Sequence, residues 1–546
     1  MPATVYDIQT QRSPLRAPKS KSVKPFPVDL VLDEITDAES ERNNSRGEWR
    51  SLMNYTMPGR QGFDDQQAGA SRNPPEKFAS EPVRAMRRGA GNLTDALVSN
   101  DWAELTPGPV LPENRKQTFA KGLEQMTKQA FAAIRGSRFG SEALSMAFDI
   151  MVSTGFMRIN LGNSEKPLRV RAVPLHEGYP VLGPDGDIEN CHRRYVCKAG
   201  NAAREYPGAQ LTSALAKTAA NAPREKVTLV EATYYDPDEA AFRSAWIDPD
   251  RKAVMFEYAP EPVSPWITPR LAVAPGCAYG WGFGMDALSV IRVLNKMRES
   301  TLKAGAKIAG PPTLFDTRTG LNPHTIRLSA NAVGFIDGAA LNGADPFYQM
   351  PTGDPRWAEL SSEQLISLID DILLATPIVR GMDDLKGVTA YATSIRRQEV
   401  LVDRGVDLVR LVSEYPLAVF KRVVWCLSAL GQFKGITDQI VVDDRIFSMV
   451  PKGPLALAQQ SEKVQANLAF IGGLRASLGD QAVTLGIKIE DVASTLASEQ
   501  PGFPDSLIRD EEERKAMQQQ AAQITAARMT QQAPSAAPID LGAPLA

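Results

Sequence analysis

Cysteine and histidine are scarce in this chain, which has 546 residues but only four cysteines and three histidines. So few cysteines in a long chain exclude a disulfide-stabilised scaffold and favour a reducing compartment. The group Cys191, His192 and Cys197 has a spacing that matches no zinc pattern, and no second Cys/His pair follows it nearby. We therefore predict no bound metal.

Long apolar runs and an excess of positive charge are also missing. No segment reaches the roughly 18 continuous apolar residues of a membrane span, and the first residues lack the apolar core of a secretory signal. The formal net charge is -3, whereas a domain that holds nucleic acid tightly is usually basic. We expect no membrane partner, and we expect any contact with DNA to be loose and to come from local basic strips.

The signatures of common catalytic sites are absent as well. The chain contains no G-x-x-x-x-G-K-[ST] phosphate loop, no G-x-S-x-G nucleophile elbow and no H-E-x-x-H zinc motif. The acid pairs Asp370-Asp371 and Asp383-Asp384 could bind a cation in principle. However, adjacent acids on a helix point in different directions, and acids in a loop are normally solvated. We predict no cofactor and no catalytic residue.

What the chain does contain is the composition of a globular protein, with 43% hydrophobic and 23% charged residues. Residues 1–36 read as a flexible basic arm, with Arg12, Arg16 and Lys24 among serines and prolines. Alternating runs such as LRVRAV and AVMFEY, separated by Gly, Pro and Asp, predict strands over 155–284. Helical periodicity precedes and follows them, so the fold class is α+β. The predicted helices cover about 37–57, 82–100, 112–135, 140–154, 285–308, 355–375 and 389–430.

The stretch YGWGFGMDALSVIRVLNKM, residues 279–297, places three alternating glycines directly before a helical pattern. A cofactor-binding loop is one interpretation. The third glycine of the dinucleotide fingerprint is missing, however, and no series of βαβ units surrounds the stretch. The other interpretation is a turn that leads into a long helix with a different purpose.

The helix predicted over 285–308 has an unusual distribution of side chains. At about 100° per residue, Arg292, Lys296, Lys303 and Lys307 fall within a stripe about 60° wide, which Glu299 interrupts. Apolar residues lie on both sides of that stripe: Leu288, Ile291, Leu294 and Leu302 on one, and Val290, Val293, Met297 and Ile308 on the other. An ordinary surface helix buries one face only. Either this helix packs against neighbours on two sides, or it is mostly buried with a solvated basic edge.

The segment from Pro265 to Asp316 resembles portal proteins, the head-to-tail connectors of short-tailed bacteriophages. The resemblance depends on Tyr279-Gly280, Leu294-Asn295 and Pro311-Pro312, on WRSLMNYTMP and GVTAYATSIRRQE, and on GPLALAQQSEKV, which occur in the family's order over about 45–515. One departure is that Ala392-Thr393-Ser394-Ile395 stands where the family's long helix commonly has Thr-Ala-Thr-Glu.

The sequence contains no visible repeat of fixed period.

The resemblance implies a ring-forming subunit with wing, stem, clip and crown regions. After the arm at 1–36, these regions are the wing at 37–284, the stem helices at 285–308 and 356–376, the clip at 309–355, the tunnel loop at 377–389, a long kinked helix at 390–435, the wing return and start of the crown at 436–500, and a crown helix and disordered tail at 501–546. The ring, usually of about twelve subunits, is expected to stand at one capsid vertex of the virion after assembly in the host cytoplasm.

The resemblance also implies roles for particular residues. The DNA channel would be lined by Arg292, Lys296, Lys303 and Lys307, and the tunnel loop would present Arg380, Met382, Asp383, Asp384 and Lys386. The clip would contact partners through Phe315, Phe335, Phe347 and Tyr348, which could equally form the core of a small sheet. Expected partners are other copies of the chain, double-stranded DNA bound without sequence preference, the terminase large subunit, the tail adaptor and tail proteins, and the major capsid and scaffolding proteins. The alternatives are a soluble enzyme with a glycine-rich cofactor loop at 280–284, or another scaffold component of a virion.

Overall fold

A computed structural model describes most of the first 451 residues. The chain divides into two compact units, Met1–Leu455 and Ala456–Ala546, and every residue described here belongs to the first. The described residues are 24–58, 77–98, 101–108, 113–205, 209–309, 313–315, 347–349, 356–375, 410–433 and 447–451. The described residues form helices together with sheets whose strand pairs are all antiparallel, so the α+β fold class is confirmed.

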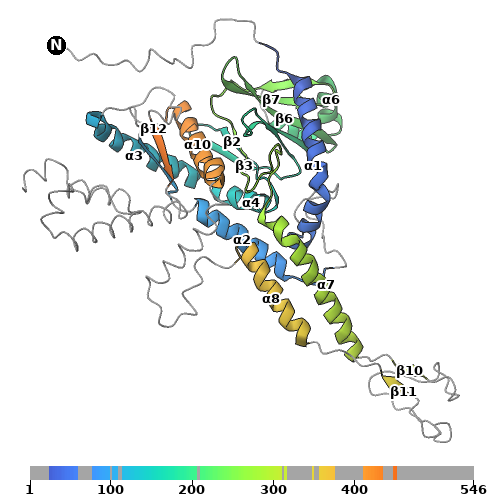
Figure 1. The fold of residues 1–546 in the computed structure, drawn as a ribbon. Helices are drawn as coiled ribbons and strands as arrows, with labels where there is room; N and C mark the ends of the chain where they lie inside the picture. The colour runs from blue at the N-terminus through green and yellow to red at the C-terminus, as the bar shows by residue number, and fades with distance from the viewer. Residues whose placement is uncertain are drawn as a thin grey trace, which may run out of the picture. The chain divides into compact units, whose positions relative to one another are not determined.

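A five-stranded antiparallel sheet is the largest β element (Figure 1). Its strands follow one another in chain order: β4 (Gly178–Leu182), β5 (Ile188–Lys198), β6 (Lys226–Asp236), β7 (Ala241–Asp248) and β8 (Ala253–Glu257). Successive residues of β6 alternate between its faces, as strand geometry requires. Val230 and Ala232 belong to the core on one face, and Leu229 belongs to the core on the other. Each face of the sheet therefore contributes to a separate hydrophobic core.

Helix α1 (Val28–Thr56) packs on the first of these faces through Val31, Ile35 and Ala38, which contribute to the same core as β6. The prediction that the flexible arm reaches residue 36 is therefore wrong. The arm's Pro and Ser pattern ends at Pro27, and residues spaced by four and three then form an apolar helical face. Helices α5 (Ala199–Glu205) and α6 (Ser213–Asn221) cover the other face.

A second sheet has the order β3 (Leu168–Ala172), β2 (Met157–Leu161) and β9 (Trp266–Ile267). Helix α10 (Ala418–Ala429) is fastened to it by Arg422, whose side chain is fully buried. The guanidinium donates hydrogen bonds to Ile159 O and Val263 O, both at 2.9 Å, and pairs with Glu261 at 2.7 Å. Just before α10, Pro416 lies in a π-helical turn (Ser413–Leu417), as expected where a proline removes a backbone hydrogen bond.

The remaining helices of the N-terminal half are close to their predicted positions. They are α2 (Glu81–Val98), α3 (Glu113–Gly136) and α4 (Phe139–Val152). One strand was not predicted: β1 (Ala103–Pro107) pairs with β12 (Phe447–Pro451), with Leu105 opposite Met449. The two strands are more than 300 residues apart, so no local pattern indicates the pairing.

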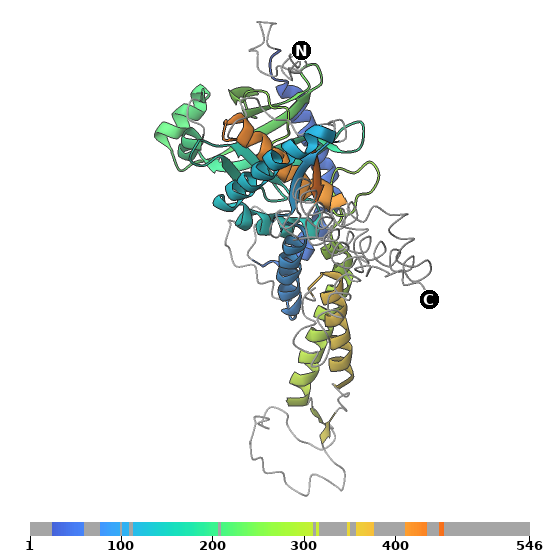
Figure 2. The ribbon, with the colours of Figure 1, turned by 90° about the vertical axis from the view of Figure 1, so that its left-hand side faces the viewer.

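Helices α7 (Phe283–Ala309) and α8 (Arg356–Ile372) form a hairpin in which the two helices lie side by side, in both Figure 1 and Figure 2. Two short strands, β10 (Thr313–Phe315) and β11 (Phe347–Gln349), pair antiparallel beyond α7 and before α8. Both helices agree with the sequence prediction. Among the described residues, we find no helix long and apolar enough to cross a bilayer.

Candidate interface on helix α7

The glycines before α7 allow a close approach between two helix ends. A Cβ on Gly282 would lie 2.4 Å from the backbone oxygens of Ile150 and Met151 in α4, and one on Gly284 would lie 2.7 Å from Met151 O. Both distances are far below van der Waals contact. The Gly282 amide also donates to Val152 O at 3.2 Å. The alternating glycines therefore let the start of α7 pack against the end of α4.

Several other amides in and just before this turn already donate to protein acceptors. Ala278 N and Tyr279 N donate to Glu41 Oε1 at 2.8 and 3.3 Å, and Gly280 N donates to Thr154 Oγ1 at 2.8 Å. A phosphate loop needs free amides that point toward the anion. The interpretation of 280–284 as a cofactor-binding loop is not supported by this geometry, which instead fixes the direction in which α7 leaves the sheet region.

Three of the four predicted channel residues are exposed on one stripe of α7. Arg292 donates to Ser51 Oγ of α1 at 3.1 Å. Lys296 pairs with Glu299 at 2.8 Å, and Lys303 pairs with the other oxygen of the same carboxylate. These hydrogen bonds, that from Lys296 first, lower the pKa of the Glu299 carboxyl from its ordinary 4.5 to about 2. The side chain of Lys307 lies outside the described residues.

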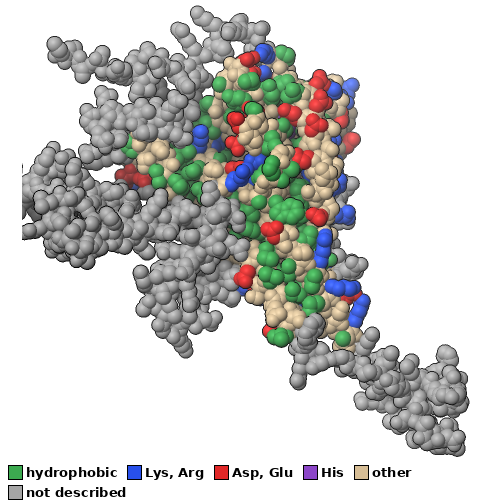
Figure 3. All heavy atoms as spheres, in the orientation of Figure 1, with side chains coloured by type: hydrophobic (Ala, Val, Ile, Leu, Met, Phe, Trp, Pro, Cys, Tyr) green, Lys and Arg blue, Asp and Glu red, His purple; other side chains and the backbone are tan. Residues whose placement is uncertain are grey.

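Exposed apolar side chains lie on opposite sides of this stripe. Val293 is 51% exposed and Leu302 is 59% exposed, and the helical angle places them about 180° apart, with the stripe between them. Figure 3 shows hydrophobic side chains on the surface of the hairpin region and Lys and Arg side chains along its edge. On α8, Leu360 and Leu368 are also exposed. Large exposed apolar patches mark interaction sites more often than isolated residues do.

One part of the predicted apolar flanks has a different role. Leu288, Ile291 and Leu294 are buried within this chain, where α7 contacts α1 and α4. They belong to the first half of the helix, which still lies beside the body of the unit. Of the two interpretations of α7, packing of both apolar flanks against neighbouring subunits is therefore wrong for these three residues, and it stays open for Val293 and Leu302.

Asn295 fastens the first half of α7 to the segment before α2. It is buried, and its Oδ1 accepts hydrogen bonds from Phe78 N at 2.8 Å and Ala79 N at 3.2 Å. In the sequence, the Leu294-Asn295 pair contributes to the family resemblance, but the sequence indicates no contact for the asparagine. An asparagine one position after a buried leucine in an otherwise amphipathic helix is a signal for such a contact, because a buried amide needs partners.

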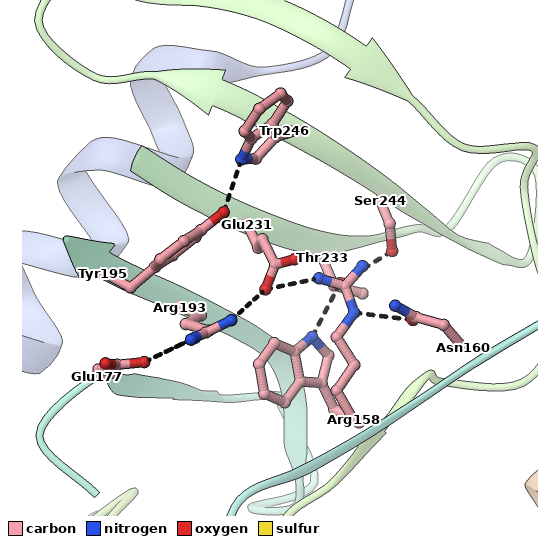
Figure 4. Close-up of polar contacts among 10 residues, drawn as sticks. Arg158, Asn160, Glu177, Arg193, Tyr195, Glu231, Thr233, Ser244 and Trp246 are labelled. Atoms are coloured by element: carbon pink, nitrogen blue, oxygen red, sulfur yellow. Dashed lines mark hydrogen bonds and ion pairs between the residues drawn. The ribbon is translucent and has the colours of Figure 1, made fainter. Parts of the chain in front are cut away.

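A buried ion network stabilises the sheets at a distance from α7 (Figure 4). Glu231 of β6 lies 3.2 Å from Arg158 of β2 and 3.2 Å from Arg193 of β5, and Arg193 also pairs with Glu177 at 2.8 Å. The Arg193 guanidinium lies 4.1 Å from the centre of the Tyr195 ring. Nothing in the sequence distinguished these arginines from exposed ones, so the network was not predicted. It links the two sheets and contains no nucleophile with an adjacent base.

The other predicted site residues lie mostly outside the described part of the chain. That is true of Arg380, Met382, Asp383, Asp384, Lys386 and Phe335, whose roles stay predictions. Phe315 stands opposite Phe347, and Leu314 opposite Tyr348, in the β10–β11 pair, although the described structure does not extend to their side chains. Within the described ranges, no cluster of three or more His, Cys, Asp or Glu residues could hold a metal ion.

The family model of the bacteriophage head to tail connecting protein matches residues 29–508. The chain belongs to this family. The match includes both helices of the hairpin, the β10–β11 pair and α10. Connectors of this family are structural components of the virion, so the prediction that the chain is not an enzyme is confirmed.

Two solved structures are similar to the connector. One, from the virion of a native gene transfer agent particle, has 12% identity and a TM-score of 0.33, and the match covers 82% of this chain and 99% of that chain. The other, from the neck of an empty gene transfer agent particle computed with C6 symmetry, has 12% identity and a TM-score of 0.31, with 77% and 91% covered. No curated protein matches the connector.

Proposed function

We propose that this connector assembles into a closed ring, a portal at one vertex of the head, through which double-stranded DNA enters during packaging and leaves during ejection. The observation that carries the proposal is the surface of α7, where an exposed cationic stripe lies between Val293 on one side and Leu302 on the other. In a head-to-tail ring each subunit has a neighbour on both sides. Such a ring covers both apolar residues and leaves the stripe facing the bore.

The dimensions of a helix are compatible with this arrangement. About twelve α7 helices, each about 10 Å across, give a circumference of about 120 Å. The ring of helix axes is then about 38 Å wide and encloses a hole of about 28 Å, wider than a DNA duplex. A net charge of -3 with local cationic stripes suits a channel through which DNA slides, because each cation that neutralises a phosphate tightens binding.

The wider architecture follows from the same proposal. Helices α7 and α8 form the stem, 309–355 the clip, 377–389 the tunnel loop and 390–435 the long kinked helix. The helices and sheets before residue 284 form the wing with the return segment from 436, and the last part of the chain forms the crown. The clip would dock the terminase large subunit and later the tail adaptor, through Phe315, Phe335, Phe347 and Tyr348. The wing would contact the capsid and scaffolding proteins during assembly in the host cytoplasm.

Replacing the exposed apolar residues tests ring formation. Val293→Asp and Leu302→Asp, singly and together, place a charge where a neighbour would bury the side chain, so the double variant should remain a folded monomer. Light scattering gives the mass, negative-stain electron microscopy shows whether rings form, and circular dichroism checks the helix content.

Leu144→Asp on α4 is the control, because Leu144 is also an exposed leucine on a helix, at 40%. It should leave the rings intact. A wild-type chain that is monomeric at high concentration, or a double variant that still forms rings, would contradict the proposed assembly.

A further inference from the structure

Glu299 holds both central lysines of the α7 stripe. It lies three residues after Lys296 and four before Lys303, so all three side chains share one face of the helix. The two ammonium groups bind different oxygens of the one carboxylate. The lysine side chains are about 70% exposed (73% and 69%), whereas that of Glu299 is 17% exposed. The carboxylate therefore has little contact with solvent, whereas the two lysines that it binds remain exposed.

This arrangement reduces the positive charge that α7 offers to solvent. Arg292, Lys296 and Lys303 contribute three positive charges to the stripe, and Glu299 cancels one of them. The remaining charge is also less available, because each lysine must leave the carboxylate before it can bind another anion. The low pKa of Glu299 keeps this carboxylate ionised at any pH near neutrality.

We infer that Glu299 attenuates the grip of the α7 stripe on the DNA backbone, so that the channel guides the duplex without clamping it. The inference rests on the proposed function, in which the stripe faces the bore. Affinity for DNA and its dependence on salt both increase with the number of cations that neutralise phosphates. A carboxylate that occupies two lysines on every subunit lowers that number around the whole ring.

The decisive measurement is the affinity of assembled rings for a short double-stranded DNA of random sequence, taken by fluorescence anisotropy over a range of NaCl concentrations. Glu299→Gln should bind more tightly than wild type. Its plot of log affinity against log salt should be steeper by about 1 to 2 for each subunit that the DNA contacts, because each added phosphate contact contributes about 0.9. Glu299→Asp keeps the charge and should remain close to wild type.

Two further variants make the outcomes distinguishable. Glu363→Gln removes an exposed carboxylate from α8 and should not change the slope of log affinity against log salt. The double variant Lys296→Gln with Lys303→Gln should bind DNA more weakly, and its slope should be less steep than that of wild type. If the lysine variant weakens binding and Glu299→Gln matches wild type, attenuation is wrong and the proposed channel stands. If the lysine variant changes nothing, the stripe does not meet DNA, and both proposals fail. Glu299→Ser replaces Glu299→Gln if the latter does not form rings.

Discussion

At the scale of single residues, the roles that the sequence could not reveal are those set by contacts with distant segments. The three alternating glycines are evident in the sequence, but the roles of Gly282 and Gly284 depend on the carbonyls of Ile150 and Met151, about 130 residues earlier. The buried arginines Arg158, Arg193, Arg270 and Arg422 are likewise indistinguishable in the sequence from exposed ones. The cationic stripe of α7 was predictable, since helical periodicity alone places its members on one face.

Gly282 gives the sharpest test at this scale. In Gly282→Ala the new Cβ would stand 2.4 Å from backbone oxygens that cannot move without shifting α4. We expect a loss of about 1–3 kcal/mol in the free energy of unfolding, as for other overpacked sites. Urea unfolding followed by tryptophan fluorescence, at matched protein concentration, measures it.

Gly47 is the control for this prediction, because it lies inside α1, is exposed, and has nothing within 4 Å of the position of its missing Cβ. Gly47→Ala should increase stability by about 0.5–1 kcal/mol, since alanine favours a helix. Equal effects of the two substitutions would show that the contact between α4 and α7 is looser than described.

At the scale of elements, helices and strands with strong periodicity were predicted to within a few residues, and the errors have physical causes. The start of α1 was missed because the apolar residues Val31 and Ile35 follow a Pro-rich segment that dominated the local pattern. Strand β1 was missed because β12 forms its partner from the far end of the described chain. The π-helical turn at Pro416 has a local cause, because a proline inside a helix removes a backbone hydrogen bond.

The π-helical turn at Pro416 carries a buried ion pair that should be important for stability. Glu414 accepts hydrogen bonds from Arg270 N and Arg270 Nη2, both at 2.9 Å, and the Arg270 side chain is 1% exposed. Glu414→Ala would leave the guanidinium buried without this carboxylate. We expect a loss of about 3–5 kcal/mol, measured as a lower urea midpoint.

An exposed pair on α3 provides the comparison for this loss. Lys128 and Glu124 interact across one helical turn, and both side chains are largely exposed. Glu124→Ala should leave the midpoint unchanged within error, because exposed pairs contribute little. A small effect of Glu414→Ala would mean that water replaces the lost carboxylate at Arg270.

At the scale of the whole molecule, the family and the α+β class followed from the sequence, whereas the surface proposed to join the subunits followed only in part. Periodicity indicated two apolar flanks on α7, but it could not show that the chain buries Leu288, Ile291 and Leu294 itself. That distinction depends on where the helix leaves the body of the unit. The tunnel-loop and clip residues stay predictions, since they lie outside the described residues or have side chains that do.

Assembly should also be visible in thermal stability. Association involves the folded chain only, so it stabilises the folded state more as the concentration rises. The melting temperature of the wild-type connector should therefore increase over a hundredfold rise in chain concentration. The double variant Val293→Asp with Leu302→Asp should have the same melting temperature at every chain concentration, equal to that of the wild type at the lowest concentration.

A wild-type melting temperature that stays constant, while light scattering shows that the rings dissociate over the same range of concentration, would mean that the interface adds nothing to folding stability. In that case Val293 and Leu302 would be exposed for another reason, because burying them against a neighbour must stabilise the folded chain.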